Sequence, residues 1–214
     1  MDPRRAVKHT LLAGARLAGG AWHGQPGPLI LTYHSVGRAG VPYTVADDVF
    51  RAQMRTLLEG GHRLLTVSEL GQSLAGGALP RRAVCVTFDD AFVNAMEPIR
   101  WLVGLGGKVT LYVVAAEPGH NHWDEHDRAI PRLPRMGWDQ LRALAAGGVE
   151  IGSHTVSHPH LPRLDDGALR EELRGSRAIL QRQLDAPVES LAYPYGEYDS
   201  RVVRAAADAG YRLA

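Results

Sequence analysis

The chain has 214 residues, of which 45% are hydrophobic and 22% charged, and its formal net charge is +1 at pH 7. This length supports one sizeable hydrophobic core, and the composition is that of an ordinary globular protein. The near-zero charge gives no reason to expect a nucleic acid partner, and no apolar run reaches the ~20 residues of a membrane span. The single cysteine, Cys85, lies in an apolar run, so we expect a reduced core residue and no disulfide framework.

Residues 1–26 are expected to lie apart from a single domain over 27–214. Arg4, Arg5 and Lys8 resemble the basic start of a secretion signal, but Arg16 interrupts the apolar stretch that follows, so no cleavable signal is expected. The segment is interpreted either as a leader or as an amphipathic basic helix in peripheral contact with a membrane. A cytoplasmic or membrane-peripheral location is therefore favoured, and the oligomeric state stays open.

Strand-like and helix-like segments alternate along the rest of the chain. In chain order they are a strand over 29–33, a helix ending at Gly60, a strand over 64–67, a helix capped by Ser68, a strand over 83–88, a helix over 92–103, a strand over 108–115, a helix over 138–146, a strand over 149–153, a helix capped by Asp165 or Asp166, a strand over 188–193, a helix over 200–209 and a strand over 211–214. This alternation predicts an α/β fold with a parallel sheet. Seven candidate strands favour a barrel, closed or incomplete at the C-terminus, with a flavodoxin-like open sheet as the alternative.

A long polar stretch over 117–135 separates two of these elements. Loops of this length in a compact domain are usually lids or binding loops. Its histidines and acids, from His120 to Asp127, suggest a second metal site, but a solvated lid explains them better.

Acidic and imidazole side chains follow two of the expected strands. Asp89 and Asp90 close the buried strand 83–88, and His154 and His158 follow the strand 149–153. Active sites of parallel α/β proteins lie at the carboxyl ends of the strands, so we expect these groups to meet. A catalytic zinc typically takes three nitrogen or oxygen ligands and leaves a position for water. The two histidines are four residues apart, so one helical turn would direct both rings to one point.

Three motifs together resemble those of the polysaccharide deacetylases, carbohydrate esterases of family 4 with a nodulation-deacetylase homology domain. They are Thr-Phe-Asp-Asp ending at Asp90, His-Thr-Val-Ser-His-Pro starting at His154, and Ala-Tyr-Pro-Tyr-Gly starting at Ala192. The resemblance covers nearly all of 29–214 and is closest to the biofilm poly-N-acetylglucosamine deacetylases. It implies a distorted (β/α)7 TIM-like barrel and a hydrolase that removes acetyl groups from an N-acetylated carbohydrate.

The resemblance also implies a metal centre. Asp90, His154 and His158 would bind one divalent metal, and Asp89 would be the general base that takes a proton from metal-bound water. Such a metal lowers the pKa of its water to about 7 and polarises the acetyl carbonyl. Zinc is favoured, although this ligand set also suits cobalt, nickel or manganese.

Further site residues are implied in the same way. The backbone N–H of Tyr195 would stabilise the oxyanion, and His34, which follows the first strand, would be the general acid, as in the biofilm enzymes. The alternative for His34 is a histidine bonded to backbone. Pro194, Tyr193 and Trp138 are candidates for substrate binding, although Trp138 fits a core position equally well.

Two positions depart from the family pattern. Ala91 stands where the first motif usually has glycine, which would cost of order 1 kcal/mol if that residue has a positive φ. Ala192 replaces the arginine that usually orients the base. Ala91, together with the early end of the chain, keeps open a catalytically silent glycan-binding domain. A hydrolase of a non-sugar amide is a further alternative, because metal sites at sheet ends support varied amide hydrolysis.

Overall fold

The structure is a computed structural model that describes residues 27–77, 80–116, 118–119 and 133–214. The expected N-terminal helix and the polar residues from His120 to Asp127 lie outside the described residues. Within the described ranges, no helix has the length and apolar character needed to cross a bilayer.

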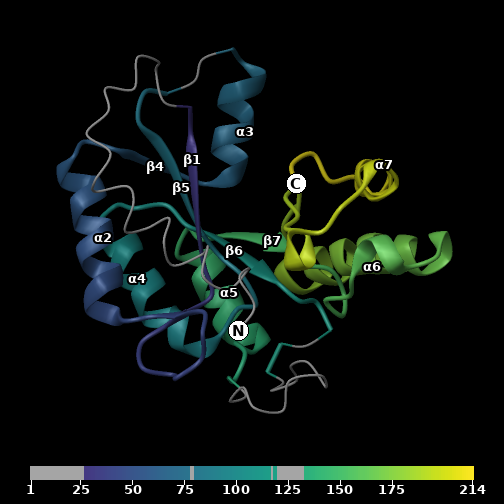
Figure 1. Ribbon diagram of the computed structural model, residues 1–214, viewed down its shortest axis with the longest axis horizontal. Helices are drawn as coiled ribbons and strands as arrows, with labels where there is room; N and C mark the ends of the chain where they lie inside the picture. The colour runs from purple at the N-terminus through teal and green to yellow at the C-terminus, as the bar shows by residue number, and fades with distance from the viewer. Residues whose placement is uncertain (1–26, 78–79, 117, 120–132) are drawn as a thin grey trace, which may run out of the picture.

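A parallel sheet forms the centre of the molecule (Figure 1). Its middle strand, β5 (Ala83–Phe88), is buried at every residue, which agrees with its uninterrupted apolar sequence. Strand β1 (Leu29–Tyr33) pairs with one edge of β5. The other edge is shared between β4 (Arg63–Leu65), which pairs with its beginning, and β6 (Thr110–Val113), which pairs with its end. Strand β7 (Glu150–Ser153) follows β6 in the sheet.

Among the described residues, the sheet continues beyond β7 only through isolated parallel bridges, between Ser153 and Leu191 and between Ser190 and Leu213. The expected strand over 188–193 is therefore reduced, and the expected strand over 211–214 contributes a single bridge. The ladder ends after Leu191 because Pro194 has no N–H to donate and the Ala192 carbonyl accepts from a side chain. A cavity of about 300 Å³ lies between β1 and Leu213, so the two ends of the sheet face each other across it. Closure of the ring is not among the described pairings.

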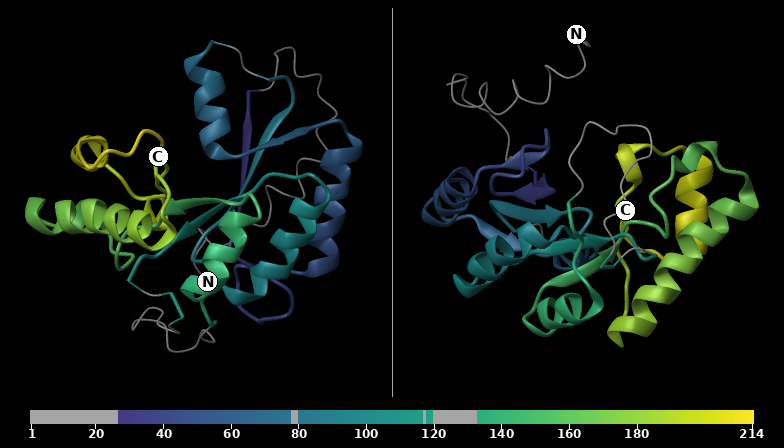
Figure 2. Two further views of the ribbon diagram at one scale, coloured as in Figure 1. Left: turned by 180° about the vertical axis from the view of Figure 1, so that it is seen from behind. Right: turned by 90° about the horizontal axis from the view of Figure 1, so that it is seen from below.

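Helices surround the sheet. They are α2 (Asp47–Glu59), α3 (Val67–Ala75), α4 (Met96–Gly104), α5 (Trp138–Ala146), α6 (Asp166–Leu184) and α7 (Ser200–Asp208), with short 3-10 turns η1 (Val93–Ala95), η2 (Leu161–Arg163) and η3 (Pro194–Gly196) and a small sheet of β2 (Ser35–Val36) and β3 (Thr44–Val45). α2 packs on α4, whereas α6 contacts both α5 and α7. In both views of Figure 2, α6 and α7 lie at the opposite end of the molecule from α2.

The α/β prediction is confirmed, and most expected elements are found within a few residues of their predicted bounds. The cap of α3 is a correction. Thr66, not Ser68, begins this helix, because Thr66 and Glu69 form a reciprocal capping box. Ser68 instead donates from its N–H and its hydroxyl to the carboxylate of Glu150.

Glu150 joins three parts of the fold at the start of β7. Besides Ser68, its carboxylate accepts hydrogen bonds from the hydroxyls of Thr110 on β6 and Ser190. Hydrogen bonds to a charged acceptor are stronger than neutral ones, so this carboxylate stabilises the amino-terminal end of the sheet. Cys85 is buried in β5, and burial raises the pKa of its thiol to about 11, as expected for an unreactive core cysteine.

Candidate metal centre

The strands β5 and β7 bring three of the predicted ligands together at their carboxyl ends. Asp90, His154 and His158 each offer one ligand atom, and these atoms lie within 4.8 Å of one another. Asp90 Oδ1 is 4.0 Å from His154 Nε2 and 3.9 Å from His158 Nε2. The two Nε2 atoms are 3.1 Å apart. All three side chains are largely buried.

Both imidazoles have the neutral charge state in which histidine binds metals. His154 Nδ1 lies 2.8 Å from the Ala192 carbonyl oxygen, which can only accept, so Nδ1 carries the proton and Nε2 presents a lone pair toward Asp90. Burial lowers the pKa of His154 to about 4 and, helped by the neighbouring His154, that of His158 to about 2. Both rings are therefore neutral at pH 7.

These residues fit a divalent cation. Two neutral imidazole nitrogens and one carboxylate are the usual protein ligands of a catalytic zinc, and they also suit other first-row ions. The two ring nitrogens converge on a buried carboxylate oxygen, so the three groups could hold one ion between them.

Left-handed backbone, rather than a helical turn, aims the two histidines. Thr155 and His158 have φ of 69° and 62°, and the segment between them is not helical, so the interpretation of the four-residue spacing was wrong. The His158 N–H donates to Thr155 Oγ1 at 3.0 Å. Glu172 of α6 holds the same loop, because its carboxylate accepts from the N–H groups of Val156 and Ser157 and from the Ser157 hydroxyl.

The turn after β5 is also left-handed. Asp90 and Ala91 have φ of 66° and 53°, so the alanine does occupy a position that favours glycine, at a cost of about 1 kcal/mol. The Ala91 carbonyl accepts from the Met136 N–H, which anchors the segment after the polar stretch to this turn. That segment places the buried Arg135 guanidinium 3.7 Å from Asp90 Oδ1.

Asp89 lies beside the three ligands. Its carboxylate is largely buried, and Oδ2 is 3.8 Å from His34 Nε2. Oδ1 is buried and has no hydrogen-bond partner among the described residues. Burial, reinforced by the negative charge of Asp90, raises the pKa of Asp89 to about 8. The structure thus places a buried carboxylate next to the candidate ligand Asp90, with a partly exposed histidine beside that carboxylate.

The profile of the polysaccharide deacetylase family matches residues 76–214, more than half of the chain. The chain belongs to the polysaccharide deacetylase family. Among curated proteins it is similar to "Putative polysaccharide deacetylase YxkH" of Bacillus subtilis (strain 168), with 27% identity over 186 residues. These residues are 86% of this chain but only 62% of that protein, so the chain spans well under the full length of this relative.

Solved structures show the same fold. The Streptococcus pyogenes deacetylase PplD in complex with acetate has a TM-score of 0.75 and 24% identity, covering 89% of this chain and 83% of that chain. IcaB from Ammonifex degensii has a TM-score of 0.73 and 24% identity, with 86% of this chain and 81% of that chain covered. At these identities the likeness concerns the fold, an α/β arrangement of parallel strands and helices as in the barrel-type deacetylases.

The third deacetylase motif forms η3 and borders the same site. Tyr195 has φ 60° and ψ 4°, and its ring packs edge-on against His158 with centroids 4.7 Å apart. Pro194 is buried. Tyr193 is half-buried and stacks on Tyr198 at 5.0 Å. Trp138 is the first residue of α5 and packs, partly buried, against the hydrophobic core.

Several residues near the candidate metal centre were not predicted from the sequence. They are Arg135, Glu172, Tyr43, His160 and Glu197. Arg135 is the last residue of the polar stretch, and Glu172 was hidden among the acidic and basic residues of α6. Tyr43 is brought to this region by the fold, and its ring stacks on Phe92 with centroids 5.9 Å apart. The sequence holds no capping or spacing pattern that points to these residues, because each of them contacts residues that are distant along the chain.

Proposed function

We propose that this protein is a metal-dependent hydrolase that removes acetyl groups from an N-acetylated sugar, glycan or glycoconjugate. The observation that carries the proposal is the convergence of the three ligands Asp90, His154 and His158, next to the buried Asp89 on which the charge of Asp90 acts. Family membership supports sugar deacetylation as the reaction.

Asp90, His154 and His158 would hold the divalent metal, with zinc as the favoured ion. When bound, such an ion polarises the acetyl carbonyl and makes water a better nucleophile near neutral pH. The neutral histidines suit this task because no proton has to leave them at pH 7.

Asp89 is the proposed general base, because it is the carboxylate next to the ligands and lies outside the set of three. Its raised pKa gives it a strong affinity for the proton that the attacking water loses. A cation held by the three ligands would favour the ionised form of Asp89, which is the form that can accept a proton. Asp90 cannot share this task while its carboxylate serves as a ligand.

His34 is the proposed general acid and Tyr195 the proposed oxyanion donor. His34 Nε2 lies 3.8 Å from Asp89 Oδ2 and its side chain is 34% exposed, so it is accessible to the amine that leaves. The Tyr195 ring packs against the candidate ligand His158, and the Tyr195 N–H would stabilise the charge that develops on the carbonyl oxygen. Pro194, Tyr193 and Trp138 remain proposed substrate contacts.

Acetate release tests the proposal. Zinc-loaded protein is incubated with N-acetylglucosamine oligomers, with a non-sugar acetamide as a second substrate, and acetate is measured. We expect release from the sugars, loss after chelation and recovery after the metal is restored. Asp89→Asn should keep the metal but lose activity, whereas Asp90→Asn should lose both. Turnover of the non-sugar amide alone, or binding of sugars by metal-loaded protein without any release, would contradict the proposal.

A further inference from the structure

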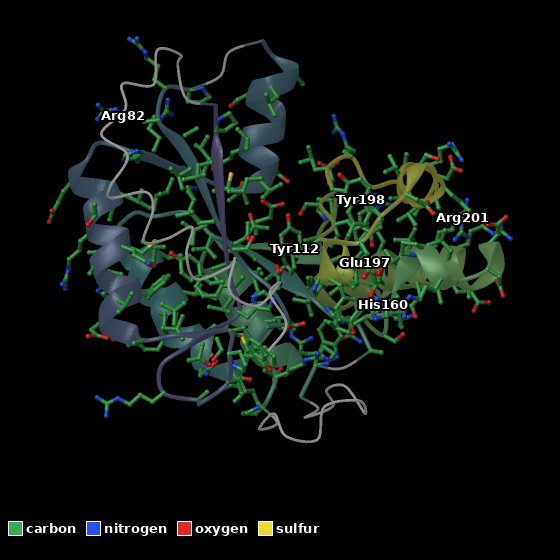
Figure 3. All side chains as sticks on the ribbon, in the orientation of Figure 1. Arg82, Tyr112, His160, Glu197, Tyr198 and Arg201 are labelled. Atoms are coloured by element: carbon green, nitrogen blue, oxygen red, sulfur yellow. The ribbon has the colours of Figure 1, made fainter. Side chains whose placement is uncertain are left out.

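A second cluster, made of His160, Tyr195 and Glu197, lies beside the candidate metal centre. His160 directly precedes η2, and Glu197 directly follows η3, so two turns distant in the sequence meet here. Figure 3 shows His160 and Glu197 close together near η3, and His160 Nδ1 lies 2.8 Å from Glu197 Oε2. The rings of His160 and Tyr195 stack with centroids 4.0 Å apart and an interplanar angle of 11°. His160 and Glu197 have no part in the metal binding or acid–base steps proposed above.

The backbone of Tyr195 is held in a conformation that aromatic residues rarely adopt. Its φ of 60° and ψ of 4° lie in the left-handed region, and the next residue, Gly196, also has a positive φ. Such outliers persist only where surrounding contacts over-determine them, and they are concentrated at functional sites. Burial of the side chain does not supply that constraint, because Tyr195 is 47% exposed.

Main-chain hydrogen bonds from the Gly196 N–H to the Tyr193 carbonyl and from the Glu197 N–H to the Pro194 carbonyl close the turn around Tyr195, and the stacked histidine adds a side-chain restraint. A carboxylate can only accept, so His160 Nδ1 donates to Glu197, and this charge-assisted hydrogen bond fixes the plane of the imidazole. The fixed ring covers one face of Tyr195, while the His158 imidazole meets it at 69°. The tyrosine is thus clamped between a histidine oriented by Glu197 and one of the candidate metal ligands.

We propose that His160, oriented by Glu197, is a positioning residue that holds the Tyr195 main chain in its left-handed conformation and so directs the Tyr195 N–H at the reacting carbonyl. The catalytic part of this inference depends on the proposed deacetylase function, whereas the conformational part does not. An oxyanion donor typically contributes about 10²–10³ in rate, and displacement by about 1 Å can remove much of it.

The test compares His160→Ala, His160→Phe, Glu197→Ala and Glu197→Gln in the full zinc-loaded chain. His62→Ala is the matched control, because His62 is another half-buried histidine whose Nδ1 lies 3.1 Å from a backbone carbonyl, that of Leu57. Acetate release gives kcat and KM, calorimetry gives the zinc Kd, and crystal structures give φ of Tyr195. We expect His160→Ala and Glu197→Ala to lower kcat about 10- to 100-fold, with KM and zinc Kd within about twofold of wild type. His160→Phe, which keeps a flat stacking ring, and Glu197→Gln, which keeps an acceptor, should retain most of kcat.

Three outcomes would overturn the inference. The first is full kcat in His160→Ala. The second is a loss of zinc affinity that matches the loss of kcat, because His160 would then act by supporting metal binding. The third is His160→Phe as impaired as His160→Ala, because stacking would then not be the function of the ring. If wild-type protein releases no acetate, the proposed function fails on its own. The conformational inference is then judged by structure alone, and a His160→Ala crystal with Tyr195 still near φ 60° would refute it.

Discussion

Glu172 offers a prediction that tests how the loop of the candidate metal centre is held. Its carboxylate, half-buried on α6, accepts from the Val156 N–H at 2.8 Å, the Ser157 N–H at 3.0 Å and the Ser157 hydroxyl. These bonds span the loop between the two histidine ligands. Glu172→Ala removes all three, while Glu172→Gln keeps a single carbonyl acceptor and loses the charge.

The magnitude follows from these contacts. Hydrogen bonds to a charged acceptor contribute about 1.5–3 kcal/mol each, but water can replace part of the loss at this half-exposed site, so we expect Glu172→Ala to lower the free energy of unfolding by about 2–3 kcal/mol. For a chain of this size that corresponds to a fall in Tm of about 4–12 °C. Loss of support behind metal ligands typically weakens metal affinity about 10- to 100-fold, and Glu172→Gln should lie between wild type and Glu172→Ala.

Thermal unfolding and zinc calorimetry measure both effects. Glu171→Ala is the matched control, since Glu171 is the exposed neighbour of Glu172 on the same helix and should change neither quantity. A Glu172→Ala protein with wild-type zinc affinity would refute the reasoning, even if its Tm fell, because the loop would then place the ligands without this carboxylate.

Three further predictions concern the base, the acid and the fold. Because the pKa of Asp89 is raised to about 8, the metal-free protein keeps a proton on Asp89 at pH 6.5, and a bound cation should expel it. Calorimetry of zinc binding in two buffers of different ionisation enthalpy should show about one proton released by wild type and none by Asp89→Asn. Equal proton release by both proteins would contradict the prediction that Asp89 holds this proton. His34→Ala should slow release of acetate from N-acetyl sugars by about 10²–10⁴ but leave an acetate ester with a good leaving group nearly unaffected, whereas equal losses on both would remove His34 from the acid role. Glu150→Ala should lower the free energy of unfolding in urea by about 2–4 kcal/mol with unchanged zinc affinity, and unaltered stability would show that its four hydrogen bonds contribute nothing net.

The sequence identified the parts of the fold that are set by local pattern. The continuous apolar run of β5 and the polar groups that follow β5 and β7 predicted a buried parallel strand and a shared site at the carboxyl edge, and both are found. The cap of α3 was assigned to the wrong hydroxyl although the signal was present. Thr66 has Glu69 three residues later, whereas Ser68 has Gly71, which cannot complete a capping box.

Other features depend on tertiary contacts, so the local sequence pattern could not predict them. The spacing of His154 and His158 suggested a helical turn, but the rings converge because Thr155 and His158 are left-handed and Glu172 holds the loop between them. Arg135 reaches Asp90 from a segment that is anchored through the main chain of Ala91. Neither arrangement has a local sequence signature, since each needs a backbone conformation that the surrounding fold imposes.

Anomalous diffraction from crystals of the zinc-loaded chain tests the central claim most directly. We predict one ion with bonds of about 2.0–2.2 Å to a carboxylate oxygen of Asp90 and to the Nε2 atoms of His154 and His158, and with Asp89 outside its ligand set. An ion bound at other residues, or an anomalous map with no peak between these three side chains, would contradict the account.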